Sequence, residues 1–286
     1  VPAWKKCLSI IIGIKVILMI RISLRTLQGY RTPILLIGLG LYAFALLLAY
    51  IFQAFGGAEG MMRYMEMMPE SMQRIAEAEG FTSDTYMGYL AGGYRHPVFL
   101  ISIAAFVIGT GSRVVAGEVE RGTILLVLSR PLMRWQFLSG KYFAIFSGLI
   151  FVLLFAWAGT WTGTLLTGEG ARTDHLVLLR VTINAVVLAL AIGGYTAFIS
   201  SFNNDGGQAT GQATAVTVVM FFLDYLATLW DAASFLGPVS IFHYYNPVAL
   251  ADGGGNPLRD ISVLILVAVI AYAFAYYYFQ RRDIAR

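Results

Sequence analysis

Charged residues are scarce in this sequence. Only 13% of its 286 residues are Asp, Glu, Lys or Arg, about half the share of an average globular protein, whereas 58% are hydrophobic. So few charges cannot cover the surface of a soluble fold of this size, and so many apolar residues exclude an intrinsically disordered chain. The composition therefore indicates a membrane protein, provided that the apolar residues form runs long enough to span a bilayer.

Cysteine is almost absent as well. Cys7 is the only one, which excludes a disulfide framework and a thiolate metal cluster within one chain. His96, His175 and His243 have no second ligand at helical spacing, so we expect loop or interfacial histidines and no metal site. We expect no nucleic-acid partner, because the net charge of +4 in a membrane protein reports topology first.

Apolar runs of the length that a bilayer requires, about 20 helical residues, occur six times. They lie at about residues 33–55, 97–116, 142–168, 176–201, 206–230 and 261–280. The sequence therefore predicts an all-α polytopic membrane protein with a six-span transmembrane domain over residues 33–286. A long external loop (56–96) and a cytoplasmic loop (117–141) connect the first three spans.

Six spans place both termini on one side, and the basic residues indicate which side. If the termini are cytoplasmic, the inner side holds 14 of the 20 basic residues: Lys5, Lys6, Lys15, Arg21, Arg25, Arg31, Arg113, Arg121, Arg130, Arg134, Lys141, Arg281, Arg282 and Arg286. The outer six are outnumbered by acids of the same loops. The positive-inside rule therefore predicts cytoplasmic N- and C-termini in the cytoplasmic (inner) membrane.

The first residues, 1–32, resemble neither a span nor a signal peptide. Lys15 interrupts the apolar run, and no small-residue cleavage site follows it. Arg21, Arg25 and Gln28 share one face of a helix. We therefore expect an interfacial helix on the cytoplasmic side that leads into the first span.

Two external segments have unusual compositions. The loop 56–96 is rich in Met and acidic residues, which fits an amphipathic helix on the outer face, a soft-metal site or an export-side lid. The amphipathic helix is favoured, because Met commonly fills such helices and Pro69 splits the run. Residues 234–250 contain Pro238 and Pro247 and are too short to span, so they predict a re-entrant pair of short helices.

Span five carries the polar features that a lipid-facing helix does not need. Asp224 is the one carboxylate deep in a span, which makes it a candidate pathway residue for a cation, a proton or a substrate amine. Hydrogen bonds from neighbouring Tyr or Thr residues explain it equally well. Gly207, Gly211 and Ala215, spaced by four, let helices approach closely, as ordinary packing within the subunit or as a dimer contact, and the former is favoured.

The cytoplasmic loop contains a patterned segment. It opens with charged and small residues at Glu118, Glu120, Arg121, Gly122 and Thr123. Acids suit the positive start of a helix, and a short apolar helix ends at Pro131. One face of this short helix carries an apolar stripe that fits the groove of a partner protein; it consists of Ile124, Leu125 and Leu128. A plain connector on the membrane surface explains the pattern as well.

This loop resembles a known one. Its order Glu-x-Glu-Arg-Gly-Thr, Leu-Leu, Ser-Arg-Pro, Arg and Gly-Lys is similar to the loop after span two in permease subunits of the type-2 ABC exporter family. The stretches 244–250 and 279–284 also resemble that family, and the resemblance runs from about Arg21 onward. Phe222-Leu223-Asp224 is similar to an element of the branch that contains the nitrous-oxide-reductase maturation permease.

The resemblance implies a permease that pairs with a second copy or a paralogue and sits on two separate ATP-binding subunits. Its cytoplasmic loop would be the coupling helix, in which the five residues from Glu118 to Thr123 named above dock on the ATPase. The chain has no Walker-type phosphate loop, so we expect a partner to bind ATP and Mg and to hydrolyse ATP. The chain itself then has no cofactor and no catalytic residue and is not an enzyme. The resemblance also implies export.

Two other functions compete with transport. A mechanical membrane platform would use ATP hydrolysis to act on an external partner protein without moving a substrate. A continuous polar pathway at the dimer interface would favour transport, and a dry, tightly packed interface would favour the platform. An intramembrane enzyme has the least support, because only Asp224 is deep and His-Glu-x-x-His is absent.

Overall fold

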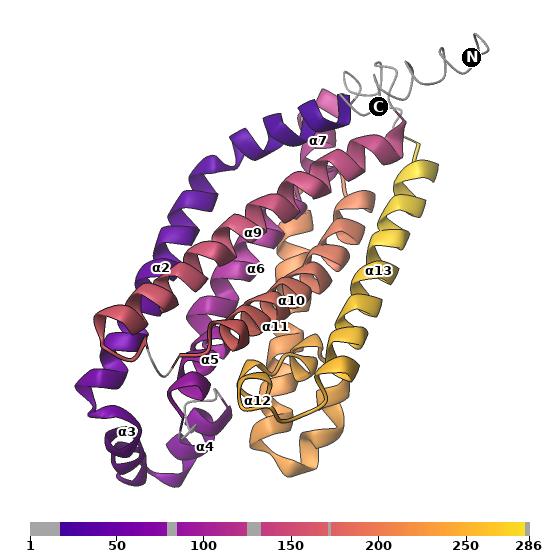
Figure 1. Cartoon of the computed structure of the whole chain (residues 1–286). Coiled ribbons are helices and arrows are strands. Elements are labelled where there is room, and N and C mark those ends of the chain that lie inside the picture. The colour runs from indigo at the N-terminus through magenta and orange to yellow at the C-terminus, as the bar shows by residue number, and fades with distance from the viewer. Residues whose placement is uncertain (1–17, 79–84, 125–132, 171–172, 284–286) are drawn as a thin grey trace, which may run out of the picture.

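The computed structural model describes residues 18–78, 85–124, 133–170 and 173–283. All regular secondary structure in these ranges is helical, which confirms the predicted all-α fold class. Figure 1 shows the longest helices side by side in one elongated bundle. The helix at residues 18–29 and the last turn of the final helix lie at the same end of this bundle, together with the short helix α7 (Ala116–Glu120).

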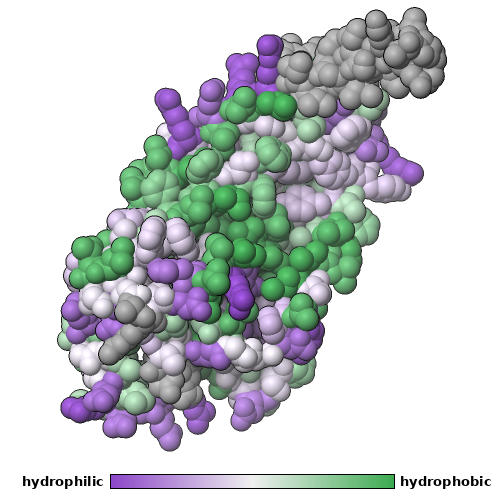
Figure 2. Space-filling model, in the orientation of Figure 1, coloured by the Kyte–Doolittle hydropathy of each residue, from purple (hydrophilic) through white to green (hydrophobic). Residues whose placement is uncertain are grey.

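Five helices are long and apolar enough to cross a membrane: α2 (Arg31–Ala54), α9 (Arg134–Leu166), α10 (His175–Phe202), α11 (Gly206–Leu229) and α13 (Pro257–Arg281). The helices α5 (Tyr86–Arg95) and α6 (Pro97–Gly111) pass the same test together and count as a sixth span if the pair crosses as one. Figure 2 shows hydrophobic surface over the middle of the bundle and hydrophilic residues mainly toward its ends. The chain is therefore a multi-pass membrane protein.

The bend between α5 and α6 is 44° and has a local cause. Pro97 opens α6 without a backbone N–H, so the hydrogen-bond ladder cannot run through this point. His96 takes a non-helical conformation, and its Nδ1 accepts the backbone N–H of Val98 at 3.2 Å, which caps α6. The span expected at 97–116 is thus entered from a buried helix and not from a loop.

Two helix boundaries differ from the expected spans. The helix of the second span ends at Gly111. Beyond it, the backbone N–H groups of Val115 and Ala116 both donate to the Ser200 hydroxyl at 3.2 Å and not to carbonyls of the preceding helical turn. The third helix starts at Arg134, before the expected position 142. The charge of Lys141 marks the end of the apolar run in the sequence, but a charged side chain does not interrupt backbone hydrogen bonds. The helix α9 therefore extends on the N-terminal side of Lys141 as far as Arg134.

Residues 18–29 form the described part of the expected N-terminal helix, and residues 1–17 lie outside the described ranges. Arg21, Arg25 and Gln28 are exposed, as expected for one face of an interfacial helix. The opposite face is anchored, because the buried Ser23 hydroxyl donates to the carbonyl of Gly140 in α9 at 2.9 Å. Figure 1 shows this helix turning away from the direction of α2.

The two segments that the sequence predicts to be external are helical in the described residues. The loop 56–96 contains α3 (Gly57–Glu66) and α4 (Glu70–Ala78), separated at Pro69, and both have polar and apolar sides. Between α11 and α13 the chain forms the 3-10 helices η2 (Asp231–Val239) and η3 (Ile241–Tyr244) and the helix α12 (Pro247–Ala251). Phe235 and Val239 of η2 are largely exposed, whereas Ile241 and Phe242 of η3 are buried, so this segment folds back onto the bundle.

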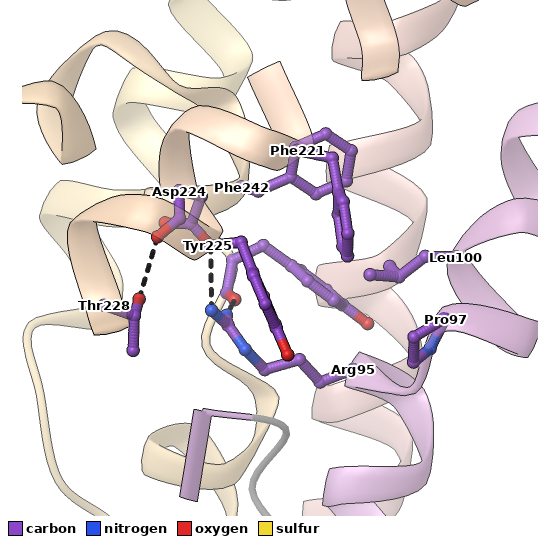
Figure 3. Close-up of a pocket in the computed structure, with 9 residues that line it drawn as sticks. Arg95, Pro97, Leu100, Phe221, Asp224, Tyr225, Thr228 and Phe242 are labelled. Atoms are coloured by element: carbon purple, nitrogen blue, oxygen red, sulfur yellow. Dashed lines mark hydrogen bonds and ion pairs between the residues drawn. The ribbon is translucent and has the colours of Figure 1, made fainter. Parts of the chain in front are cut away.

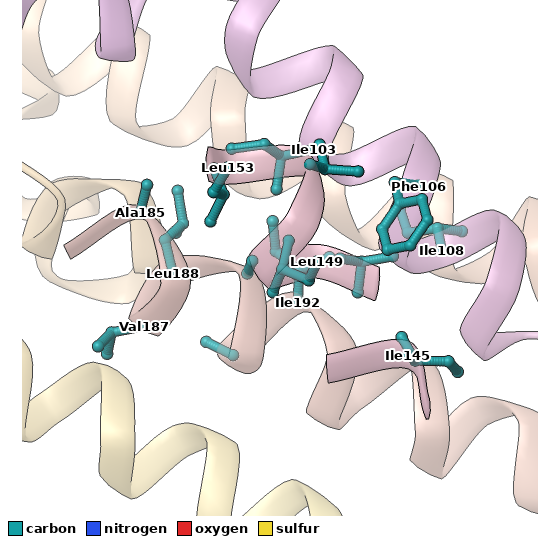
Figure 4. Packing of buried hydrophobic residues seen from close by; sticks show 14 of the residues in the cluster. Ile103, Phe106, Ile108, Ile145, Leu149, Leu153, Ala185, Val187, Leu188 and Ile192 are labelled. Atoms are coloured by element: carbon teal, nitrogen blue, oxygen red, sulfur yellow. The ribbon is translucent and has the colours of Figure 1, made fainter. Parts of the chain in front are cut away.

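The core depends on close helix pairs. A Cβ on Gly159 of α9 would lie 2.4 Å from the Tyr42 carbonyl oxygen of α2, so glycine permits this approach. Gly163 fulfils the same role against Ala49. Figure 4 shows buried side chains of α6, α9 and α10 meeting in the main cluster, among them Ile103, Leu149 and Leu188. In contrast, only 17% of the apolar stretch of α11 is buried, against 61% for α10.

Candidate functional site

The patterned loop lies at the end of the bundle that holds both α7 and the last turn of α13, and Glu118 anchors it. Its Oε1 lies 2.8 Å from Lys141 Nζ of α9 and 3.5 Å from Arg121 Nη2, and Thr123 donates its hydroxyl to Oε2. Burial on its own would raise the pKa of the Glu118 carboxyl. The hydrogen bonds from Lys141 and Thr123 and the charges of Lys141 and Arg121 together lower that pKa below its usual value.

Glu120 ties the same loop to the start of α11. Its Oε2 accepts the backbone N–H of Gly206 at 2.9 Å, and Asp205 caps the helix by accepting the N–H of Gln208 at 2.7 Å. Two carboxylates thus face the positive end of the α11 dipole. A Cβ on Gly206 would lie 3.2 Å from this Glu120 oxygen, so the small residue allows the approach.

The five predicted coupling residues therefore differ in whether their side chains are bonded within the chain or exposed. Glu118, Glu120 and Thr123 are engaged within the chain, and Gly122 turns the backbone with a φ of +68°. Arg121 keeps 55% of its side chain exposed. Ile124 of the expected apolar stripe is buried in the bundle, and the rest of the expected apolar helix lies outside the described residues from position 125. Among the described part of this motif, Arg121 and Gly122 are exposed, and Glu120 is exposed as well although its carboxylate accepts the Gly206 N–H.

Two of the similar sequence stretches meet in space. Arg134, at the start of α9, donates from Nη1 to the carbonyls of Phe279, Gln280 and Arg282 at 3.0, 3.3 and 2.6 Å. Arg282 in turn donates to the carbonyls of Ser201 and Asn203, at the end of α10, at 2.7 and 2.9 Å. These carbonyls have no partner within their own helices, so the two guanidinium groups complete the helix ends.

Asp224 lies near the opposite end of the bundle in a buried ion pair. Its Oδ2 is 2.9 Å from Nη2 of Arg95, the last residue of α5, and only 8% of its side chain is exposed. The Arg95 Nη1 also donates to the Tyr245 carbonyl at 2.6 Å. The guanidinium thus joins α5, α11 and the segment after η3, as Figure 3 shows for Arg95 and Asp224.

The second carboxylate oxygen of Asp224 has a different environment. Oδ1 lies 3.9 Å from His243 Nδ1, beyond hydrogen-bond distance. The Thr228 hydroxyl donates to the Asp224 backbone carbonyl and not to its carboxylate, at 2.9 Å. The charged partner of the carboxylate is thus Arg95 of α5, and the role of Asp224 as a pathway residue or as a structural residue stays a prediction.

A groove runs beside this ion pair between α6 and α11. It encloses about 520 Å³ and is lined by apolar side chains and three threonines: Pro97, Leu100, Ile101, Ala104, Ala105, Ile108, Gly109, Thr210, Thr214, Thr217, Val218, Phe221, Phe222 and Phe242. A hollow of about 20 Å³, room for one water molecule, adjoins it around Arg95 and Asp224. The groove is large enough for a small ligand.

The small-residue stripe of α11 faces outward beside this groove. Gly207, Gly211 and Ala215 are exposed, and a Cβ on Gly211 would meet nothing within 4 Å. Helical geometry places the stripe next to the groove face that carries Thr210, Thr214 and Val218. Both explanations, packing within the subunit and a dimer contact, stay predictions, and the outward position of Gly211 fits the dimer contact.

Sequence reasoning missed the partners of three arginines. A lone carboxylate in a span requires a cation, and Arg95, directly before the expected span two, was the available signal. Arg134 and Arg282 appeared as topology-setting charges and within the stretches that resemble the family, without an assigned partner. Their carbonyl partners are far along the chain, and no local pattern marks them.

Two comparisons with known proteins bear on this arrangement. Residues 34–284 match the family model described as ABC-2 family transporter protein. The chain is also similar to an uncharacterized protein of Bacillus subtilis (strain 168), YhcI, with 25% identity over 208 residues. This match covers 65% of the chain and 66% of the relative, so the chain spans slightly less than two thirds of that protein's length.

Proposed function

The chain belongs to the ABC-2 transporter family as the membrane-spanning permease component of an ABC transporter, and we propose that it forms half of a dimeric exporter driven by two separate ATP-binding subunits. The family match over residues 34–284 carries this proposal, because it includes every long apolar helix of the described bundle. The partner subunits bind ATP and Mg and perform the hydrolysis. The nitrous-oxide-reductase branch stays a prediction.

The outward face of α11 supports dimerisation. Gly207, Gly211 and Ala215 let a second helix approach closely, and their exposure in the single chain leaves this face available. The exposed Val219, Phe222 and Leu226 extend the same side of α11 with apolar surface. A second copy, or a paralogue with a similar face, therefore fits against α11.

The α7 end supports coupling to the ATP-binding subunits. Glu118 connects the loop to α9 and Glu120 connects it to α11, so a force on the exposed Arg121 turn reaches two spans directly. We therefore assign Glu118, Glu120 and Thr123 to transmission and Arg121, with Gly122, to docking. This division refines the expectation that all five residues contact the ATPase.

The distribution of basic residues supports the orientation. Arg21, Arg31, Arg121, Arg134 and Arg282 lie in elements that reach the α7 end of the bundle, and acids outnumber basic residues in the segments at the other end. The positive-inside rule then places the α7 end, and with it both termini, in the cytoplasm of a cell whose inner membrane holds the protein.

The groove between α6 and α11 favours transport over a mechanical platform. A platform needs no groove for a ligand, whereas the open groove of about 520 Å³ beside the proposed dimer face leaves room for a substrate. Its walls are mainly apolar and not continuously polar, so the substrate should be largely apolar as well.

Reconstitution with ATP-binding subunits tests the proposal. The full chain should co-purify with two copies of an ATP-binding subunit from the same organism, and transport into vesicles should depend on ATP. Arg121→Glu should lower the affinity for that subunit at least tenfold, the effect of about 1.4 kcal/mol, because the exposed charge is reversed.

Arg31→Glu provides the matched control, since Arg31 is exposed at the start of α2 but lies outside the loop. It should leave assembly unchanged. Equal effects of the two variants, or full coupling in the Glu120→Ala/Arg121→Ala chain, would show that the loop does not dock on the ATPase.

A further inference from the structure

The groove and the hollow around Arg95 and Asp224 adjoin each other. They share Pro97, Leu100, Phe221 and Phe242 as lining residues. The described residues that line the groove include no charged side chain, whereas Arg95 and Asp224 line the hollow at its external end. A ligand that fills both spaces is therefore apolar over most of its length and polar or charged at one end.

Aromatic rings determine which charge the hollow favours. Phe221, Tyr225, Phe242 and Tyr245 line it together with the Asp224 carboxylate, and Figure 3 shows several of these rings around the ion pair. The Phe221 and Tyr225 rings are stacked with centroids 6.0 Å apart, and Phe242 meets Phe221 edge-on at 5.6 Å. Aromatic faces and a carboxylate attract a cation and repel an anion.

Arg95 supplies the cation in this structure. Its guanidinium bonds one carboxylate oxygen of Asp224, while Oδ1 faces His243 at a longer distance. The hollow of about 20 Å³ admits a water molecule but not an ammonium head group, so Arg95 has to move before a ligand cation enters. Because Arg95 ends α5 directly before the 44° bend, a change at this bend shifts it without unfolding either helix.

We propose that the groove and hollow together bind a cationic amphiphile, with its hydrocarbon chain between α6 and α11 and its protonated or quaternary amine replacing Arg95 beside Asp224. This proposal rests on the transporter function, because it names the class of molecule that the permease moves. The aromatic rings and the carboxylate select the head group, and the groove selects the hydrocarbon chain.

Photolabelling of the purified full chain in phosphatidylcholine nanodiscs tests the proposal. The probe is a dodecylamine that carries a diazirine near the end of its chain. It should label peptides of α6 and α11. Dodecyltrimethylammonium should suppress labelling at roughly tenfold lower concentration than dodecanol or dodecyl sulfate, the difference that one charged contact provides.

Variants separate the head-group contact from the fold. Asp224→Asn should remove the preference for the ammonium, and Asp224→Glu should keep it. Arg95→Gln should strengthen ammonium binding severalfold, because the competing cation is gone. If Arg95 only supports the fold, the same variant should bind the ammonium more weakly than the natural chain.

Val218→Trp tests the groove, because the larger side chain should fill it and abolish labelling. Asp231→Asn, which changes an exposed carboxylate just after α11, is the matched control and should bind as the natural chain does.

Three results would overturn the proposal: stronger competition by dodecyl sulfate, labelling outside α6 and α11, or weaker ammonium binding by Arg95→Gln. This assay needs no ATP-binding subunit. If the natural chain shows no preference for dodecyltrimethylammonium but still couples to ATP hydrolysis, the proposed ligand class alone is refuted. Intact binding without ATPase assembly would refute the transporter function alone.

Discussion

At the scale of single residues, two arginines complete the ends of long helices. The last carbonyls of a helix lack partners within it, and near a membrane such groups are costly to leave unbonded. Arg134 serves the end of α13 and Arg282 serves the end of α10. Each arginine thereby connects elements that are distant in sequence.

Removal of the Arg134 guanidinium should destabilise the bundle. We expect Arg134→Ala to lower the free energy of unfolding by about 1.5–3 kcal/mol, the contribution of hydrogen bonds to a charged group. Thermal unfolding of the purified protein measures this change. Arg281→Ala is the control, because Arg281 is exposed and its guanidinium lies over the Tyr277 ring. Identical unfolding of both variants would contradict a structural role for the Arg134 contacts.

The Glu118 carboxyl should stay ionised throughout the physiological range. Its pKa is lowered by Lys141, Thr123 and Arg121, so its ion pairs contribute full stability above the unfolded value of about 4.5. That contribution is lost only as the pH falls below this value through the lower folded pKa. ATPase coupling should therefore show no Glu118-dependent change between about pH 5 and pH 8.

The comparison of pH profiles for the natural chain and Glu118→Gln checks this expectation. Between about pH 5 and pH 8 the variant should couple less well than the natural chain, because the neutral side chain cannot form the ion pair with Lys141 that the ionised Glu118 forms. A natural chain that loses coupling between pH 7 and 5, with a variant that does not, would show that Glu118 titrates there.

At the scale of elements, the glycines of α9 and α11 serve opposite purposes. Gly159 and Gly163 of α9 face α2 within the chain, whereas Gly207 and Gly211 of α11 face outward. Their spacing by four is the same. The sequence pattern therefore identifies a packing face but not the helix that occupies it.

Enlargement of these glycines should separate folding from dimerisation. Gly211→Leu should weaken the dimer at least tenfold with little effect on subunit stability, because a Cβ there meets nothing within 4 Å. Gly159→Leu should destabilise the subunit, since a Cβ would lie 2.4 Å from the Tyr42 carbonyl oxygen. Mass measurement of the detergent-solubilised protein and thermal unfolding provide the two readouts. A Gly211→Leu chain that dimerises normally would place the interface elsewhere.

At the scale of the whole molecule, the topology assigns each end of the bundle to one side of the membrane. In a Cys7→Ala background, Met67→Cys between α3 and α4 should react with an impermeant maleimide on intact cells. Gln28→Cys, on the exposed face of the first described helix, should react only after permeabilisation. The opposite pattern would invert the proposed orientation.

Much of the architecture could be predicted from the sequence, because the signals are local. Uninterrupted apolar runs predicted the helices, and Pro69, Pro97 and Pro247 each lie where a helix is separated or begins. Helix ends were less accurate, as α9 shows, because hydropathy follows side chains and helix length follows backbone hydrogen bonds. The motif between spans two and three indicated the family but not which of its residues bind other residues of the same chain.

The sequence by itself determined the all-α membrane class, the approximate spans and the resemblance to the ABC-2 family. Only the tertiary structure decided that Arg95 pairs with Asp224, that Glu120 caps α11, and that the stripe of α11 faces outward. The physical reason is the range of each signal. Hydropathy and turn residues act over a few neighbours, whereas the partner of a buried charge or a helix end is set by how distant helices pack.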